Sequence, residues 1–359
     1  MNMNVAIITL GIAKPNGTER AVCNLSNILA VKGYTVHIIS MKSAEGTEPP
    51  FYLNERVRIH YVGLASKGSA GRVFNFLKYI RAIREYCRDN NISVVFGTGH
   101  QTNSLIYFAG RNVRKIACEH MPYHSLRNKI SAKVRKLIYP RLDAVITLTD
   151  GDAENYRSFM AAEKVHVIPN SLSFPADKRS DTKTKRIIAV GRLTEQKNFP
   201  ALIEAAVTVK QQCPDWRIDI FGSGDDDEKL LSMIAGKKLN GYVALHPPVN
   251  DIKSEYLASG MLAVSSIFEG FHLGILEAEA CGLPVVSFNC NYGPAALIHD
   301  GVNGFLVDVG DVDGLAEKII TLAQNDVLRG KMGGESFRNA KNYEPESIAE
   351  KWLELIGSI

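Results

Sequence analysis

The chain has 359 residues, of which 45% are hydrophobic and 22% are charged, with a formal net charge of +4 at pH 7. These values are typical of a soluble globular protein with room for two domains, each with its own core. No transmembrane helix is expected, because the most apolar segment, residues 256–268, is too short to cross a bilayer. The N-terminal residues lack the basic region of a signal peptide, and the six cysteines are scattered without a C-x-x-C pair. We therefore expect a cytoplasmic protein with free thiols and no metal site made of cysteines.

Apolar and amphipathic segments alternate along the first half of the chain. This alternation predicts parallel strands joined by helical crossovers, as in a doubly wound α/β domain. The predicted strands are residues 5–10, 35–40, 94–96, 115–118 and 144–148, and the predicted helices are residues 19–31, 73–90 and 132–139.

Two loops of this half carry candidate site residues. Asn16 and Gly17 follow the first strand, and we expect them in a turn with left-handed backbone whose helix N-terminus can meet an anion. The alternative is an ordinary strand–helix turn. Glu119 and His120 follow another strand, where side chains project toward ligands. His120 could be an acid, a base or a hydroxyl partner, although most single histidines are structural; His100 is a weaker candidate.

A basic segment spans residues 111–141, in which Glu119 is the only acid. Within it, Lys129, Lys133 and Lys136 have the spacing of one helical face. This face is either simply solvated or a contact for anionic lipid headgroups, which would make the protein peripheral at the inner face of the cell membrane. Nucleic acid is not an expected partner, because no nucleic-acid-binding motif accompanies the patch.

A polar, turn-rich segment at residues 171–185 separates two domains, 1–172 and 173–344. The final helix, residues 345–359, could pack back on the first domain. We therefore expect two doubly wound α/β domains facing a central cleft. The second domain has predicted strands at 186–190, 217–221, 241–245, 261–264 and 284–288, and predicted helices at 200–211, 226–235, 253–257, 275–281 and 314–324.

The loop after the first strand of the second domain carries Arg192 and Lys197. It matches neither G-x-x-x-x-G-K-[ST] nor G-x-G-x-x-G. Its two cations nevertheless lie at the carboxyl end of a strand, where α/β sheets bind ligands, and an Arg with a Lys can neutralise a diphosphate. The alternative is two surface cations without a ligand.

Residues 265–284 are the most informative part of the chain. A strand leads through Gly270 and Gly274 into a helix, so free backbone N–H groups and the helix dipole can hold an anion. Glu269 and Glu277 add acceptors for hydroxyl groups, although a helix cap or a surface acid would explain each of them. Together the features suggest a ligand that is part phosphate and part polyol, such as a nucleotide sugar. The acidic run at 225–228 is interpreted as the start of a helix and not as a metal site.

These residues resemble the retaining glycosyltransferases of the GT-B fold that form family GT4. The resemblance covers nearly the whole chain and is strongest between residues 187 and 307. Its hallmark is E-x7-E, from Glu269 to Glu277. Further matches are G-R-L-x-x-x-K-N at 191–198, A-C-G-L-P-V-V at 280–286 and D-G-x-N-G-x-L-V at 300–307.

The resemblance implies that the first domain binds an acceptor and the second a nucleotide-sugar donor. It implies transfer of a hexose or N-acetylhexosamine from a UDP-linked donor, with retention and without a metal or other cofactor. The acceptor would be a glycan or lipid-linked glycan of surface polysaccharide or lipopolysaccharide. Two alternatives are a nucleotide-sugar epimerase with the GT-B fold and a catalytically silent sugar-nucleotide binding protein.

The resemblance also assigns roles to individual residues. Relatives usually have Gly-Gly where this chain has Asn16 and Gly17; Asn tolerates a left-handed backbone better than other non-Gly residues, so the loop is expected to keep its form. His120 would lie beside the reacting sugar. By the same resemblance, Arg192 and Lys197 hold the donor diphosphate, Glu277 holds the ribose, and Glu269 holds the transferred sugar together with the backbone of Gly270, Phe271, His272 and Leu273.

Overall fold

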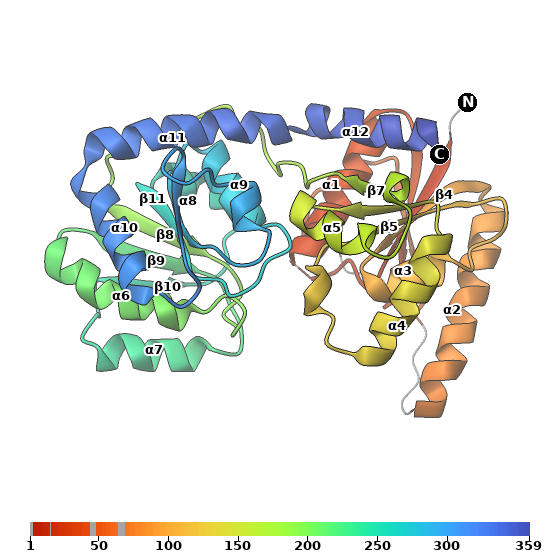
Figure 1. The fold of residues 1–359 in the computed structure, drawn as a ribbon, viewed down its shortest axis with the longest axis horizontal. Helices are drawn as coiled ribbons and strands as arrows, with labels where there is room; N and C mark the ends of the chain where they lie inside the picture. Colours follow the sequence, from red (N-terminus) through yellow and green to blue (C-terminus); the bar gives the residue numbers. More distant parts are fainter. Residues whose placement is uncertain (1–2, 15, 44–47, 64–68) are drawn as a thin grey trace. The chain divides into compact units, whose positions relative to one another are not determined.

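The computed structural model describes residues 3–14, 16–43, 48–63 and 69–359, with no side-chain description for 69–75 (Figure 1). The chain forms two compact units. The first comprises Met1–Ser171 together with Pro345–Ile359, and the second comprises Leu172–Glu344. The chain therefore leaves the first unit, forms the second, and returns. The returning helix α12 (Pro345–Ser358) packs against α1 (Gly17–Val31) of the first unit.

The first unit is built on a parallel sheet with the strand order β3-β2-β1-β4-β5-β6-β7. The order changes direction between β1 and β4, so the loops that follow these strands diverge and leave a crevice at the carboxyl ends. The strands are β1 (Asn4–Thr9), β2 (Thr35–Ser40), β3 (Val57–Tyr61), β4 (Ile92–Thr98), β5 (Arg114–Cys118), β6 (Ala144–Thr147) and β7 (Val165–Val167). The helices besides α1 and α12 are α2 (Ser69–Asp89), α3 (His100–Ile106), α4 (Lys129–Ile138) and α5 (Asp150–Arg157).

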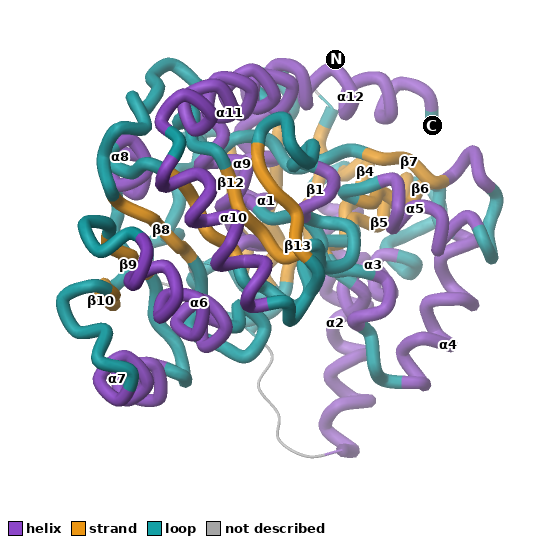
Figure 2. Tube along the Cα trace, turned by 60° about the vertical axis from the view of Figure 1, so that its left-hand side comes forward, coloured by secondary structure: helices purple, strands orange, loops and turns teal. Residues whose placement is uncertain are grey.

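The second unit repeats this plan, and its parallel sheet has the order β10-β9-β8-β11-β12-β13 (Figure 2). Its strands are β8 (Arg186–Val190), β9 (Arg217–Phe221), β10 (Val243–His246), β11 (Met261–Val264), β12 (Val285–Phe288) and β13 (Gly304–Val307). Its helices are α6 (Phe199–Gln212), α7 (Asp227–Gly236), α8 (Ile252–Leu257), α9 (Leu273–Ala280), α10 (Val312–Gln324) and α11 (Asp326–Ala340). The direction of the order changes between β8 and β11.

The central strands consist mostly of buried apolar residues, since helices cover both faces of each sheet. All residues of β11 and of β12 are buried. Helix α6 packs against α7 and α10, whereas α9 packs against α8 and α11. Parallel strands that are buried on both faces require continuous apolar runs, which is why these segments could be predicted as strands. The expectation of doubly wound α/β domains is confirmed.

The sequence prediction missed several elements. Strand β3, helices α3 and α5, and strands β7 and β13 are short, so each offers little periodicity. Helix α11 was also not predicted, and its glycines, Gly330, Gly333 and Gly334, give it a low helix propensity. Packing explains one of them: a Cβ on Gly333 would lie 2.3 Å from the backbone oxygen of Gly282. The close approach of α11 to the end of α9 outweighs the poor intrinsic propensity.

Two further expectations concerned free thiols and the absence of a transmembrane helix. All six cysteines are buried and none forms a disulfide. In the described part of the chain, no helix combines the length and the apolar character that a membrane span requires.

Candidate functional site

The point where the strand order of the second unit changes direction brings together the loops that follow β8 and β11. The loop after β8 carries Arg192 and Lys197, and the loop after β11 carries Glu269 and His272. Loops at such a point in an open α/β sheet are where ligands bind. The predicted residues of this unit therefore gather at one place.

Three hydrogen bonds connect the two loops. The backbone N–H of Ile267 donates to the backbone oxygen of Gln196 at 2.9 Å, and Gln196 Nε2 donates to the backbone oxygen of Phe268 at 3.0 Å. Ser265 Oγ donates to the backbone oxygen of Lys197 at 3.0 Å. The loops thus have fixed positions relative to each other. Gln196 is a site residue that was not predicted from the sequence, since no motif spacing marks a residue that links two loops through a backbone oxygen.

Lys197 and Glu269 form a buried ion pair. Lys197 Nζ lies 2.7 Å from Glu269 Oε1, and the two side chains are 15% and 9% exposed. Burial alone would raise the pKa of Glu269, but the charge of Lys197, together with hydrogen bonds from Lys197 and Ser266, outweighs it and brings this pKa below its ordinary value. Glu269 is therefore a carboxylate at neutral pH, ready to accept hydrogen bonds from hydroxyl groups.

His272 caps the following helix. Its Nδ1 accepts a hydrogen bond of 3.1 Å from the backbone N–H of Ile275 at the start of α9. Its Nε2 lies 3.2 Å from Lys197 Nζ. Burial, with the nearby charge of Lys197, lowers the pKa of His272 to about 4, so the ring is neutral at neutral pH. Glu277 lies one turn further along α9 and is also buried.

Two contacts position Arg192 and its loop: one with Gln196 and one with the turn after β9. Arg192 is exposed, and its Nη2 donates to Gln196 Oε1 at 3.2 Å. The turn after β9 supports its backbone: Leu193 N–H donates to the oxygen of Ser223 at 2.9 Å. This approach requires glycine at positions 222 and 224. A Cβ on Gly222 would lie 1.9 Å from the backbone oxygen of Gly191, and a Cβ on Gly224 would lie 2.2 Å from that of Leu193. The role of this turn is structural: it supports the loop that carries Arg192.

A fourth loop, after β12, packs against Glu269. Tyr292 pairs with Glu269 in an isolated parallel bridge and has a left-handed φ of 70°. A Cβ on Gly293 would lie 2.9 Å from Glu269 Cβ. The turn that contains Tyr292 and Gly293 thus positions Glu269.

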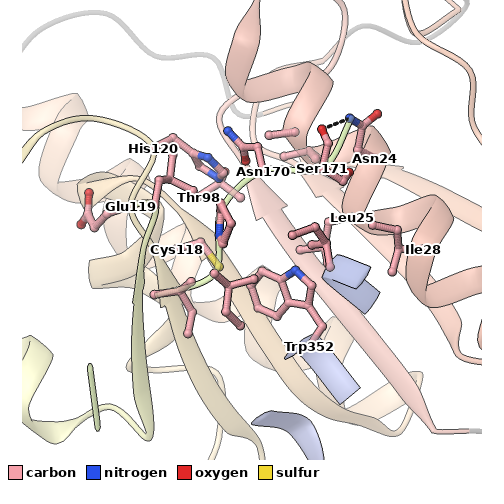
Figure 3. A pocket seen from close by; sticks show the side chains of 17 residues that line it. Asn24, Leu25, Ile28, Thr98, Cys118, Glu119, His120, Asn170, Ser171 and Trp352 are labelled. Carbon is pink, nitrogen blue, oxygen red and sulfur yellow. Dashed lines mark hydrogen bonds between the residues drawn. The ribbon is translucent and has the colours of Figure 1, made fainter. Parts of the chain in front are cut away.

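In the first unit, His120 follows β5 and lines a cavity of about 30 Å³ (Figure 3). The cavity lies between α1, the end of β5 and α12, and Asn170, Ser171 and Trp352 also line it. His120 Nδ1 and Ser171 Oγ are buried without a hydrogen-bond partner among the residues that the structure describes. Such a space suits one or two water molecules. Burial lowers the pKa of His120 to about 4, so this ring is also neutral at neutral pH.

Glu119 points away from the ring of His120 in Figure 3. It accepts hydrogen bonds from Asn103 Nδ2 at 3.0 Å and from the hydroxyl of Tyr139. Burial raises the pKa of Glu119 to about 7. Its partners are internal, so Glu119 fixes the end of β5 from which His120 projects.

The expectation for Asn16 and Gly17 is wrong in its geometry. Asn16 has a φ of −102° and a ψ of 164°, which is extended backbone, and it is the N-cap residue of α1. Its Nδ2 donates to Glu19 Oε1 at 3.2 Å. An extended N-cap needs no left-handed residue, which explains why Asn can stand where relatives have Gly. Pro15, the preceding residue, lies outside the described residues.

No group of three or more His, Cys, Asp or Glu side chains suited to a metal ion is found in residues 3–14, 16–43, 48–63 and 69–359. The acidic run at 225–228 leads into α7, with Asp227 and Glu228 in its first turn. Acidic side chains at this position complement the helix dipole.

Comparisons with known proteins show the family of the chain. A family model described as Glycosyltransferase Family 4 matches residues 15–173, and one described as Glycosyl transferases group 1 matches residues 172–338. The amylovoran biosynthesis glycosyltransferase AmsD of Erwinia amylovora is 29% identical, with 98% of each chain covered. A relative in Campylobacter jejuni, 26% identical with 99% of each chain covered, is named N-acetylgalactosamine-N,N'-diacetylbacillosaminyl-diphospho-undecaprenol 4-alpha-N-acetylgalactosaminyltransferase.

A solved structure has the same fold. TarM of S. aureus, in complex with Fondaparinux, alpha-GlcNAc-glycerol and UDP, superposes with a TM-score of 0.84 at 17% identity, covering 99% of this chain and 100% of that one. The two family models together span both units, and their junction coincides with the junction of the units. The chain therefore belongs to the GT-B glycosyltransferases of family 4, and its activity is the transfer of a glycosyl group.

Proposed function

We propose that the protein is a retaining glycosyltransferase that transfers a hexose or N-acetylhexosamine from a UDP-sugar to a glycan of surface polysaccharide or lipopolysaccharide. The observation that carries this proposal is the buried cluster of Lys197, Glu269 and His272 beside the exposed Arg192. It offers cations to a diphosphate and a carboxylate to sugar hydroxyls within a few ångströms. The second unit would bind the donor and the first unit the acceptor.

The names of the relatives support the choice of substrates. The solved TarM structure contains UDP, which supports a uridine nucleotide as donor. The relative in Erwinia amylovora is named for amylovoran biosynthesis. The relative in Campylobacter jejuni is named for a sugar on diphospho-undecaprenol, which supports a lipid-linked acceptor.

The proposed reaction needs no metal ion or other cofactor. As the bond between the anomeric carbon and the phosphate oxygen breaks, negative charge grows on the diphosphate, where Arg192 and Lys197 stabilise it. The departing phosphate oxygen takes the proton of the acceptor hydroxyl, and the acceptor oxygen forms the new bond on the same face of the sugar. Glu269 holds the hydroxyls of the sugar, and Glu277 those of the ribose. His120, neutral at neutral pH, positions the sugar and is not a nucleophile.

The proposal is tested by donor hydrolysis, which needs no knowledge of the acceptor. UDP-sugars and GDP-sugars are incubated with the enzyme in excess EDTA, and the released sugar is followed by proton NMR. We expect slow release of UDP from one UDP-α-sugar, with the α-anomer as the first product. Because Arg192, Lys197 and the N-terminus of α9 stabilise the charge of the diphosphate, EDTA should not slow the reaction.

Four results would contradict parts of this proposal. A β-anomer released from an α-donor would exclude retention, and loss of activity in EDTA that Mg²⁺ or Mn²⁺ restores would exclude metal independence. An epimerised UDP-sugar without release of UDP would favour the epimerase. A trapped glycosyl adduct on Glu269 would keep retention but replace same-face transfer by two displacements.

We further propose that α4 contacts an anionic membrane. Lys129, Lys133 and Lys136 are all exposed on this helix. Ile130 and Leu137 are 75% and 60% exposed on the same helix. Apolar side chains among cations suit the boundary between headgroups and acyl chains, where each cation contributes about 1 kcal/mol.

Changing Lys129, Lys133 and Lys136 to Glu should therefore weaken binding to vesicles that contain phosphatidylglycerol by roughly 100-fold, measured by sedimentation at moderate salt. Donor hydrolysis should stay unchanged. The matched control reverses three exposed lysines of the second unit, Lys183, Lys229 and Lys331, and should leave binding intact. Equal binding of vesicles by both triple variants would contradict the membrane contact and favour the interpretation of α4 as a solvated helix face.

A further inference from the structure

Hydrogen-bond donors face both ring nitrogens of His272, although a neutral imidazole can accept at only one of them. Its Nδ1 lies 3.1 Å from the backbone N–H of Ile275, and its Nε2 lies 3.2 Å from the ammonium group of Lys197. A neutral imidazole accepts at one ring nitrogen and donates at the other. One of the two contacts therefore joins two donors.

The backbone contact determines which nitrogen carries the proton. The N–H of Ile275 is fixed by the helix and cannot turn away, whereas the three N–H groups of Lys197 can rotate. The positive end of the α9 dipole also disfavours an N–H at Nδ1. Nδ1 is therefore the acceptor, and Nε2 carries the proton.

The Nε2–H group then lacks an internal acceptor. Glu269 Oε1 lies 3.9 Å from Nε2, which is too far for a hydrogen bond, and this oxygen is already paired with Lys197 at 2.7 Å. The ring is 3% exposed. Among the described residues, the group within hydrogen-bonding distance of Nε2 is the ammonium of Lys197, which is itself a donor.

We propose that the Nε2–H of His272 and the ammonium of Lys197 form a two-donor clamp for one phosphoryl oxygen of the nucleotide donor. This inference rests on the proposed function and adds a side-chain role to a residue otherwise expected to contribute backbone. An anionic oxygen that accepts from both groups would resolve the surplus of donors. Because the imidazole is neutral at neutral pH, it adds directionality without adding charge.

The asparagine variant separates the clamp from the helix cap. In His272→Asn, the side-chain oxygen can still accept from Ile275, since Asn is a favourable N-cap, but the donor at Nε2 is gone. We expect the affinity for UDP, measured by calorimetry, to fall roughly tenfold, whereas the affinity for uridine stays the same. The melting temperature should match the wild type. His272→Ala should lose the same affinity and also melt earlier, because its cap is missing.

The tautomer gives a test that does not depend on activity. NMR of the ¹⁵N-labelled histidines should find His272 protonated at Nε2 in the free protein and unchanged between pH 6 and 8, because its pKa is about 4. His299→Asn, an exposed histidine of the same unit, is the control and should bind UDP normally.

The outcomes distinguish this inference from the proposed function. Unchanged UDP affinity in His272→Asn, or a proton on Nδ1, would overturn the clamp. If Lys197→Ala loses UDP binding at the same time, the proposed function stands without the clamp. A wild-type protein that binds no UDP would overturn both.

Discussion

Replacing Arg192 or Lys197 by Ala should slow donor hydrolysis at saturating donor by roughly 100- to 1,000-fold, which is the usual effect of removing one preorganised donor. Both cations are expected to meet the charge that grows on the leaving diphosphate. The effect should appear in kcat as well as in KM, because this charge is larger in the transition state than in the bound donor. Equal turnover of the wild type and either variant would contradict the assignment.

The two variants should differ in stability. Arg192 is exposed, so its loss should leave the melting temperature unchanged. Lys197 is 15% exposed and pairs with Glu269, which is 9% exposed, so Lys197→Ala leaves a buried carboxylate without its cation. Breaking such a pair costs about 3–5 kcal/mol. The double variant Lys197→Ala/Glu269→Gln removes the stranded charge and should regain most of the stability but none of the activity. This control separates damage to the fold from loss of the diphosphate contact.

Substituting Gly222 or Gly224 by Ala should destabilise the second unit and weaken UDP binding together. The new Cβ would lie 1.9 Å from the oxygen of Gly191 or 2.2 Å from that of Leu193, and these are backbone atoms that cannot rotate away. Overpacking of this kind costs about 1–3 kcal/mol or more, because the loop that carries Arg192 must move. Thermal unfolding and calorimetry with UDP measure the two effects.

Gly236→Ala is the matched control. Gly236 ends α7 in the same unit, and a Cβ there would meet no atom within 4 Å. Ala is the better helix former, so this variant should be as stable as the wild type or slightly more stable. If Gly222→Ala behaved like Gly236→Ala, the close approach of the two loops would not matter for the site.

The sequence predicted the position of the site because parallel sheets direct the carboxyl ends of all strands to one edge. Arg192, Lys197 and Glu269 could be found from their places after strands that are themselves apolar runs. The partners of these residues could not be found in this way. Gln196 binds backbone atoms of a loop about seventy residues away in sequence, a contact that leaves no spacing pattern. The cap formed by His272 depends on where α9 begins, and helix ends are poorly determined by sequence.

The errors have the same origin. Asn16 was expected in a left-handed turn from its preference alone, but the start of α1 requires an extended N-cap there. Helix α11 was missed because its glycines lower its helix propensity, and the reason for one of them, the close approach of Gly333 to Gly282, lies in a distant segment. The intrinsic conformational preference of a residue does not predict its structure where tertiary packing contributes more free energy than that preference.

The return of α12 to the first unit has a consequence for how the protein is made. On the ribosome, the second unit is synthesised as one continuous block, whereas the first must wait for the end of the chain to complete its core. Trp352 of α12 packs edge-on against Phe96 of β4 at 5.7 Å, and Arg114 of β5 donates to the backbone oxygen of Ile356 at 2.8 Å. Until these contacts form, the sheet synthesised first has an uncovered apolar surface, and closing so long a loop is slow. Premature termination shortly before α12 would therefore damage the part of the molecule that was synthesised first.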